Sequence, residues 1–178
     1  MKKFGNLGRN LLILAGLILI GAAAFILFAP ERRDRDYQLI IGGAFALVSV
    51  ICFLSFGANR RMYFRPGWLL QSAFFMLIFS VILFFLPYLS FEMNVMVYAF
   101  LAFFFAASQF GAAIQLMALE IRRWWLVLIF AVNNLIFGIY FIKLCSVFNL
   151  SEYPSVAIFM VVTGGIIAAE QFVYKKNN

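Results

Sequence analysis

Residues 65–87 read RPGWLLQSAFFMLIFSVILFFLP, and residues 122–141 read RRWWLVLIFAVNNLIFGIYF. In both stretches a basic residue precedes a tryptophan, and a long apolar run follows. Trp68 and Trp125 lie 57 residues apart (125 − 68 = 57), and Leu11 opens an earlier apolar run at the same interval (68 − 11 = 57). A fixed interval marks a repeated structural unit. The sequence therefore predicts three tandem helical hairpins.

The composition indicates where these hairpins lie. Of the 178 residues 66% are hydrophobic and 12% are charged, and the mean hydropathy is +1.01. A water-soluble fold needs a more polar exterior, whereas a helix that spans a bilayer needs about 20 apolar residues. We therefore expect an all-α, polytopic membrane protein, a single integral membrane domain over residues 1–178 whose six transmembrane helices form three repeated hairpins. The expected helices cover roughly residues 10–29, 37–56, 67–87, 94–119, 124–146 and 153–174.

The first apolar run, with Lys2 and Lys3 before it, resembles a secretory signal. The repeat favours a retained helix instead, because Pro30 ends this run 57 residues before Pro87 ends its counterpart (87 − 30 = 57). With the N-terminus inside, the inner segments carry ten basic residues and the outer segments carry four. Cytoplasmic segments collect Lys and Arg. The distribution predicts a multi-pass protein of the bacterial inner membrane with both termini in the cytoplasm.

The starts of the odd-numbered helices carry the expected interfacial anchors. Tryptophan favours the headgroup layer of a membrane, and basic side chains bind anionic lipid headgroups. We expect membrane lipids as partners and no nucleic acid, because position in the membrane explains the net charge of +7. The expected inner-interface anchors are Arg65, Trp68, Arg122, Arg123, Trp124 and Trp125.

The residue types needed for most catalytic chemistry are scarce. The chain has no histidine, which excludes histidine-ligated haem, His–metal sites and Ser–His–Asp triads. The seven acidic residues fall mostly in the expected turns, and no glycine-rich phosphate loop is present. We therefore expect a protein that is not an enzyme, with no catalytic residues, no metal site and no cofactor.

Polar residues inside the apolar runs are the candidate functional residues. An ionisable group within a span is a functional candidate, although Glu170 is also close enough to the inner surface to reach water or Lys175. The amides either line a polar pathway or form hydrogen bonds between helices. Adjacent Asn133 and Asn134 point about 100° apart on a helix and so face different neighbours. The candidate intramembrane polar residues are Glu170, Asn133, Asn134, Gln71, Gln109 and Gln115.

Small residues predict how the helices pack. Three pairs of small residues are spaced four apart, which lets helix backbones approach closely in lipid. They are Gly42 with Ala46, Gly164 with Ala168, and Gly165 with Ala169. These pairs lie in the even-numbered helices, which we therefore expect in the middle of the bundle. The same faces also allow a homo-oligomer.

The two stretches quoted above resemble the repeated hairpin of the HdeD-like family of small bacterial membrane proteins. The resemblance runs from Arg9 to Lys176 and rests on the basic-aromatic start, the prolyl turn and the repeat. It implies six spans and a non-enzymatic inner-membrane protein associated with acid or envelope stress, of unknown mechanism. The alternative is a small transporter or channel that uses the intramembrane amides and Glu170, with an unknown substrate.

Overall fold

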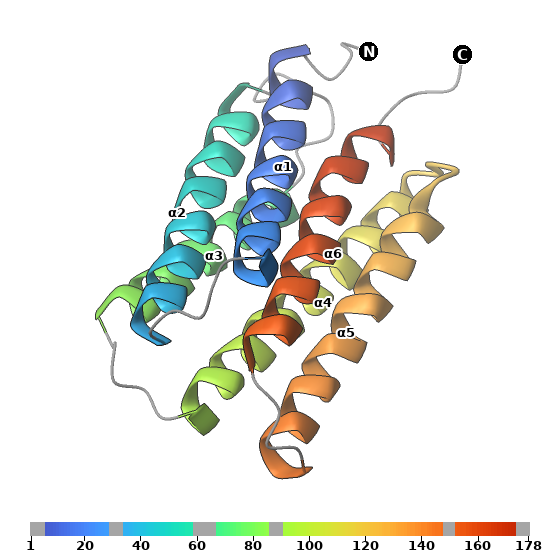
Figure 1. Cartoon of the computed structure of the whole chain (residues 1–178). Helices are drawn as coiled ribbons and strands as arrows, with labels where there is room; N and C mark the ends of the chain where they lie inside the picture. The colour runs from blue at the N-terminus through green and yellow to red at the C-terminus, as the bar shows by residue number, and fades with distance from the viewer. Residues whose placement is uncertain (1–5, 29–33, 59–66, 86–90, 148–151, 174–178) are drawn as a thin grey trace.

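The computed structural model describes residues 6–28, 34–58, 67–85, 91–147 and 152–173, which form six helices (Figure 1). Each helix begins and ends within four residues of the expected bounds, because the apolar runs themselves set the helix lengths. The helices are α1 (Asn6–Phe28), α2 (Asp34–Ala58), α3 (Gly67–Phe85), α4 (Phe91–Ala118), α5 (Trp124–Val147) and α6 (Glu152–Val173).

Length and composition make this an integral membrane protein. Helices α1 to α5 are each long and apolar enough to cross a bilayer. Helix α6 has 22 residues, of which the described apolar part is Tyr153–Ala169. The described residues contain no strand. The predicted class, a polytopic helical membrane protein, is confirmed.

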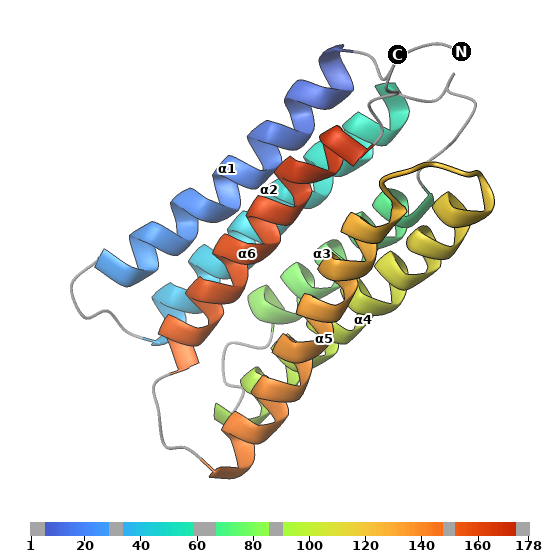
Figure 2. The same cartoon turned by 90° about the vertical axis from the view of Figure 1, so that its right-hand side faces the viewer.

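The six helices form a closed ring. Helices that follow one another in the chain pack together, and α6 packs along α1. Figure 2 shows α1 and α4 on opposite sides of this ring. The most extensive contacts are α4–α5, α1–α6 and α2–α3, which join different hairpins, whereas α5 and α6 touch least of all neighbours. Successive hairpins therefore pack together, through α2–α3 and α4–α5, more closely than α3 packs against α4 or α5 against α6.

The ring corrects one expectation from the sequence. The even-numbered helices do not occupy the middle of the bundle, because all six helices are members of the ring, although α4 also touches α6. Helix α3 is buried to the same extent as α2, while α4 is the most buried of the first five helices and α5 the least.

The buried faces reveal the repeat interval more sharply than the tryptophans do. From α1 to α3 the counterparts are 57 residues apart, as in Leu12 and Leu69 (69 − 12 = 57). From α3 to α5 they are 58 apart, as in Leu69 and Val127 (127 − 69 = 58). The further buried sets are Gly16, Ala73 and Ala131; Leu19, Met76 and Asn134; Ala23, Ser80 and Gly138; and Ile26, Leu83 and Phe141.

The third hairpin is therefore turned by one residue relative to a uniform 57-residue repeat. Phe130 would be the counterpart of Ala73 at that interval, but a phenylalanine is too large for a close helix contact. Ala131 is fully buried there instead, and Phe130 is half-buried. The same shift holds in α6, where Gly164 lies 58 residues after buried Ala106 (164 − 106 = 58).

Small residues occupy corresponding places at the three junctions between hairpins. At α2–α3 the Ser49 hydroxyl donates a hydrogen bond of 2.7 Å to the Ala73 carbonyl. The corresponding residues at α1–α6 are Gly16 and Gly164, where a Cβ on Gly164 would lie 2.7 Å from the Gly16 carbonyl oxygen. At α4–α5 the corresponding pair is Ala106 and Ala131, both buried. Without large side chains at these places the backbones can approach directly.

The small-residue pairs expected from the sequence differ in whether their glycine contacts a neighbouring helix. Gly42 faces α3, since a Cβ there would lie 3.3 Å from Leu83, and the Ser80 hydroxyl donates to the Gly42 carbonyl at 2.9 Å. Gly164 packs against Gly16, Leu19 and Ile20 of α1, the close helix approach that the small-residue pair predicts. Gly165 has nothing within 4 Å of an added Cβ, so it belongs to the face turned away from the bundle.

The turn between α4 and α5 is closed by backbone hydrogen bonds. The N–H of Ile121 donates to the Leu116 carbonyl at 3.0 Å, and the N–H of Glu120 donates to the Met117 carbonyl at 3.0 Å. This pair of bonds defines a Schellman motif, whose C′ residue is usually glycine. Glu120 occupies that position with φ 55°, a conformation that is costly for a residue with a Cβ.

Candidate functional site

A buried pair of amides joins α4 and α5. The Nδ2 atom of Asn134 on α5 donates a hydrogen bond of 2.8 Å to Oε1 of Gln109 on α4, and both side chains are buried. The sequence left two interpretations of the amides open, a polar pathway and interhelical hydrogen bonds. This pair forms an interhelical hydrogen bond. The corresponding residues at the other two junctions are Cys52 with Met76, and Ile167 with Leu19, all of them buried and less polar.

Aromatic rings join α4, α5 and α6 on the side of this pair that faces away from the chain ends. The ring of Phe159 on α6 lies 6.4 Å from Phe105 on α4, centroid to centroid. It also lies 5.4 Å from Phe137 and 5.6 Å from Phe141 on α5. Because one side chain contacts both other helices, the three helices converge on the interior of the ring at this depth.

One helical turn from these aromatic rings, toward the end where α1 begins and α6 ends, lies a layer of polar side chains. Residues four apart share a face of a helix, so Gln109 follows Phe105 and Thr163 follows Phe159 on the same faces. Asn133 and Asn134 stand four and three residues before Phe137, at the same depth of α5. We call Gln109, Asn133, Asn134 and Thr163 the polar layer.

Three atoms of the polar layer are buried without a hydrogen-bond partner among the described residues. They are Nδ2 of Asn133, Oδ1 of Asn134 and Oγ1 of Thr163. Asn134 and Thr163 are 0% and 2% exposed, respectively. The layer thus combines one unmatched donor with two unmatched oxygen atoms. Burial of such atoms without a partner costs free energy.

The remaining candidate residues lie elsewhere. Gln71 and Gln115 are exposed on α3 and α4, within about two turns of the end that carries the chain termini. A side chain at that depth can reach the headgroup layer. The Glu170 side chain lies outside the described residues, so its predicted role stays a prediction. The structure thus brings together only three of the six candidates.

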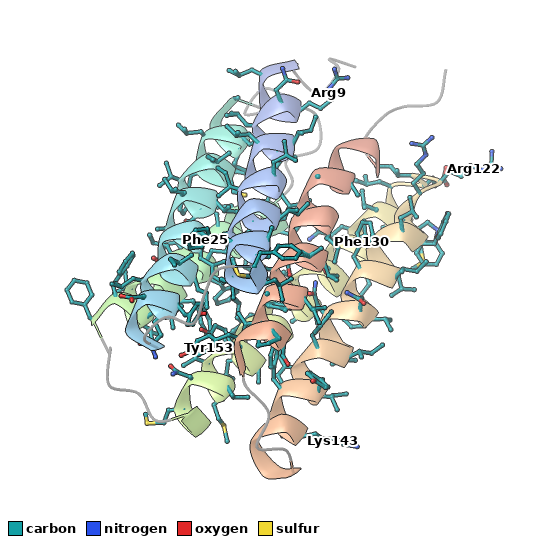
Figure 3. The ribbon with its side chains drawn as sticks, in the orientation of Figure 1. Arg9, Phe25, Arg122, Phe130, Lys143 and Tyr153 are labelled. Carbon is teal, nitrogen blue, oxygen red and sulfur yellow. The ribbon has the colours of Figure 1, made fainter. Side chains whose placement is uncertain are left out.

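The expected interfacial anchors take different positions at that same end. Trp68 is buried in the core, Trp124 is half-buried against it, and Trp125 is 48% exposed. Arg122 is exposed and Arg123 half-buried, while Arg65 lies outside the described residues. Figure 3 shows Arg9 and Arg122 at this end of the bundle and Lys143 at the other.

Sequence reasoning missed the hydroxyl groups. Ser49, Ser55 and Ser80 each donate to a backbone carbonyl of a neighbouring helix, at 2.7, 3.0 and 2.9 Å. Thr163 belongs to the polar layer but was not a candidate. The available signal was position, since Thr163 is the single threonine of the chain and lies in the middle of an apolar run.

The chemistry of the site is neutral. The described part of the chain contains no group of three or more His, Cys, Asp or Glu residues that could hold a metal ion. The polar layer itself offers only amides and a hydroxyl, which exchange hydrogen bonds but carry no charge near neutral pH.

Fold and site together define a polytopic α-helical membrane protein, built as a pseudo-threefold ring with one neutral polar layer. The chain matches no family profile, no curated protein and no solved structure.

Proposed function

We propose that this membrane protein is a non-enzymatic component of the bacterial inner membrane, of the HdeD-like type, that supports survival under acid or envelope stress. The observation that carries the non-enzymatic part is the filled interior of the ring. Tyr98, Phe141 and Phe159 are each 0% exposed and occupy its interior.

The stress role rests on the resemblance of the repeated hairpin, and survival measures it directly. A strain that lacks the gene is compared with the parent and with a complemented strain after exposure to low pH. We expect reduced survival and increased permeability of the envelope to a dye, both restored by the intact gene. Equal survival and equal permeability in all three strains would remove the stress role.

The proposed orientation has both termini in the cytoplasm. It predicts that a cysteine at exposed Arg122 is labelled only from the cytoplasm, and a cysteine at exposed Lys143 only from outside. Both variants are made after Cys52 and Cys145 are replaced by alanine. A membrane-impermeant maleimide applied to intact spheroplasts, then to inverted vesicles, compares the two sites. Labelling of Arg122→Cys from outside would reverse the orientation.

A second candidate function is a small transporter or channel, and the polar layer favours it. Of the three junctions, only α4–α5 carries a buried amide pair, Gln109 with Asn134. Purified protein in liposomes should then release an entrapped ion or a small neutral solute. The control is Asn134→Leu, which restores the apolar character of its counterparts Leu19 and Met76. Absence of any flux under all gradients would leave the first proposal alone.

A further inference from the structure

The turned third hairpin decides which of its residues take the buried places of the core. In the first two repeats, the places of Asn134 are taken by Leu19 and Met76, and the places of Thr163 by Val48 and Phe105. All four residues are buried and apolar. The third repeat thus replaces apolar core by polar groups at the same depth on two adjacent helices, α5 and α6.

The unmatched atoms form a complementary set. Nδ2 of Asn133 is a donor, Oδ1 of Asn134 is an acceptor, and the Thr163 hydroxyl is both. Phe137 and Phe159 are in contact one turn away, which brings α5 and α6 together close to the depth of Asn133, Asn134 and Thr163. This place also lies between α5 and α6, the neighbouring helices with the least extensive contact.

The chemistry of the set selects its occupant. A cation is disfavoured, because Asn133 presents a donor and none of the three side chains carries a negative charge. An ion without compensating charge is costly to bury. A buried water molecule makes about three hydrogen bonds to groups that would otherwise be unsatisfied. Three such groups lie at this depth of α5 and α6.

We propose that Asn133, Asn134 and Thr163 bind a water molecule in the middle of the membrane-spanning bundle. The water accepts a hydrogen bond from Nδ2 of Asn133 and donates to Oδ1 of Asn134 and Oγ1 of Thr163. It would thus join two asparagines that the sequence assigned to different neighbours. The Gln109–Asn134 hydrogen bond holds the Asn134 amide in the orientation that presents Oδ1 to this water. The site stands whether or not the protein transports a solute.

The first test detects the water itself. The full-length protein, labelled with ¹⁵N at asparagine and reconstituted in nanodiscs, is examined for rotating-frame Overhauser cross-peaks between water and the side-chain amide protons. Their sign separates a bound water from proton exchange. We expect cross-peaks at Asn133 and Asn134, reduced at least about threefold in Thr163→Val, which removes one of the three hydrogen-bonding partners. Their absence in the unaltered protein would overturn the proposal.

The second test uses thermal unfolding in detergent. Thr163→Val keeps the shape of the side chain and removes the hydroxyl. If water joins the three groups, the substitution lowers Tm by about 2–4 °C, and Thr163→Ser retains most of the Tm. If the site is dry, Thr163→Val removes an unpaired hydroxyl and leaves Tm unchanged or raises it, which would contradict the proposal.

A double-mutant cycle then tests whether the groups act through one shared molecule. Asn133→Leu introduces an apolar side chain like those of its half-buried counterparts Ile18 and Phe75. With a shared water, the double variant Asn133→Leu with Thr163→Val loses less Tm than the sum of the single variants, because the first change already removes the bridge. Additive losses would mean that no common molecule joins them.

Discussion

Substitution of Gly164 by alanine tests the contact that closes the ring. The new Cβ would lie 2.7 Å from the Gly16 carbonyl oxygen and 3.1 Å from the side chains of Leu19 and Ile20. Backbone atoms cannot turn aside as a flexible side chain can, so α1 and α6 must separate. Overpacking of this kind costs about 1–3 kcal/mol. For a chain of this length each kcal/mol lowers Tm by about 2–4 °C.

The adjacent glycine supplies the matched control. Gly165→Ala adds the same methyl group to the same helix, but nothing lies within 4 Å of it. Alanine favours a helix over glycine by about 0.5–1 kcal/mol, so this variant should be as stable as the unaltered protein or slightly more stable. The two substitutions therefore differ in sign although their chemistry is the same.

The assay is thermal unfolding of both purified variants in the same detergent, followed by circular dichroism or by intrinsic fluorescence. Gly16→Ala is the reciprocal variant and should lose stability as well, since its Cβ would meet the Gly164 carbonyl and lie 2.9 Å from the Ala168 Cβ. Equal Tm values for Gly164→Ala and Gly165→Ala would refute direct contact between the backbones of α1 and α6.

Three further substitutions test other parts of the ring. Gly138→Ala places a Cβ 2.8 Å from the ring of Phe103; because a side chain can move, Tm should fall by less than in the α1–α6 case, and Phe103→Leu in the same molecule should restore it. Ser49→Ala removes an interhelical hydrogen bond and should lower the free energy of unfolding by about 0.6–2 kcal/mol, measured by denaturant titration; no loss would mean that water replaces the bond. Glu120→Gly should raise the free energy of unfolding by about 1–2 kcal/mol, because glycine adopts φ 55° without steric cost; a lower Tm would show that the Glu120 side chain contributes more than this strain.

Part of the architecture was readable from the sequence because the membrane imposes a simple rule. A span must be apolar and must satisfy its own backbone hydrogen bonds, so an apolar run of suitable length predicts a helix. The number of helices, their bounds within four residues and the threefold repeat follow from that rule. The amide pair was also predictable as a pair of candidates, since Gln109 and Asn134 interrupt apolar runs.

The ring and the polar layer were decided only by the tertiary structure. Outside water, hydrophobicity does not choose between helix faces, so the close fit of side chains makes that choice. Phe130 does not fit where Ala73 does, and Ala131 takes its place, which turns the third hairpin by one residue. That turn directs Asn134 and Thr163 into the bundle. The sequence by itself determined six spans in three repeats. Steric fit at the junctions decided that the repeats close into a ring, and that the third repeat places Asn134 and Thr163 where the first two repeats have apolar residues.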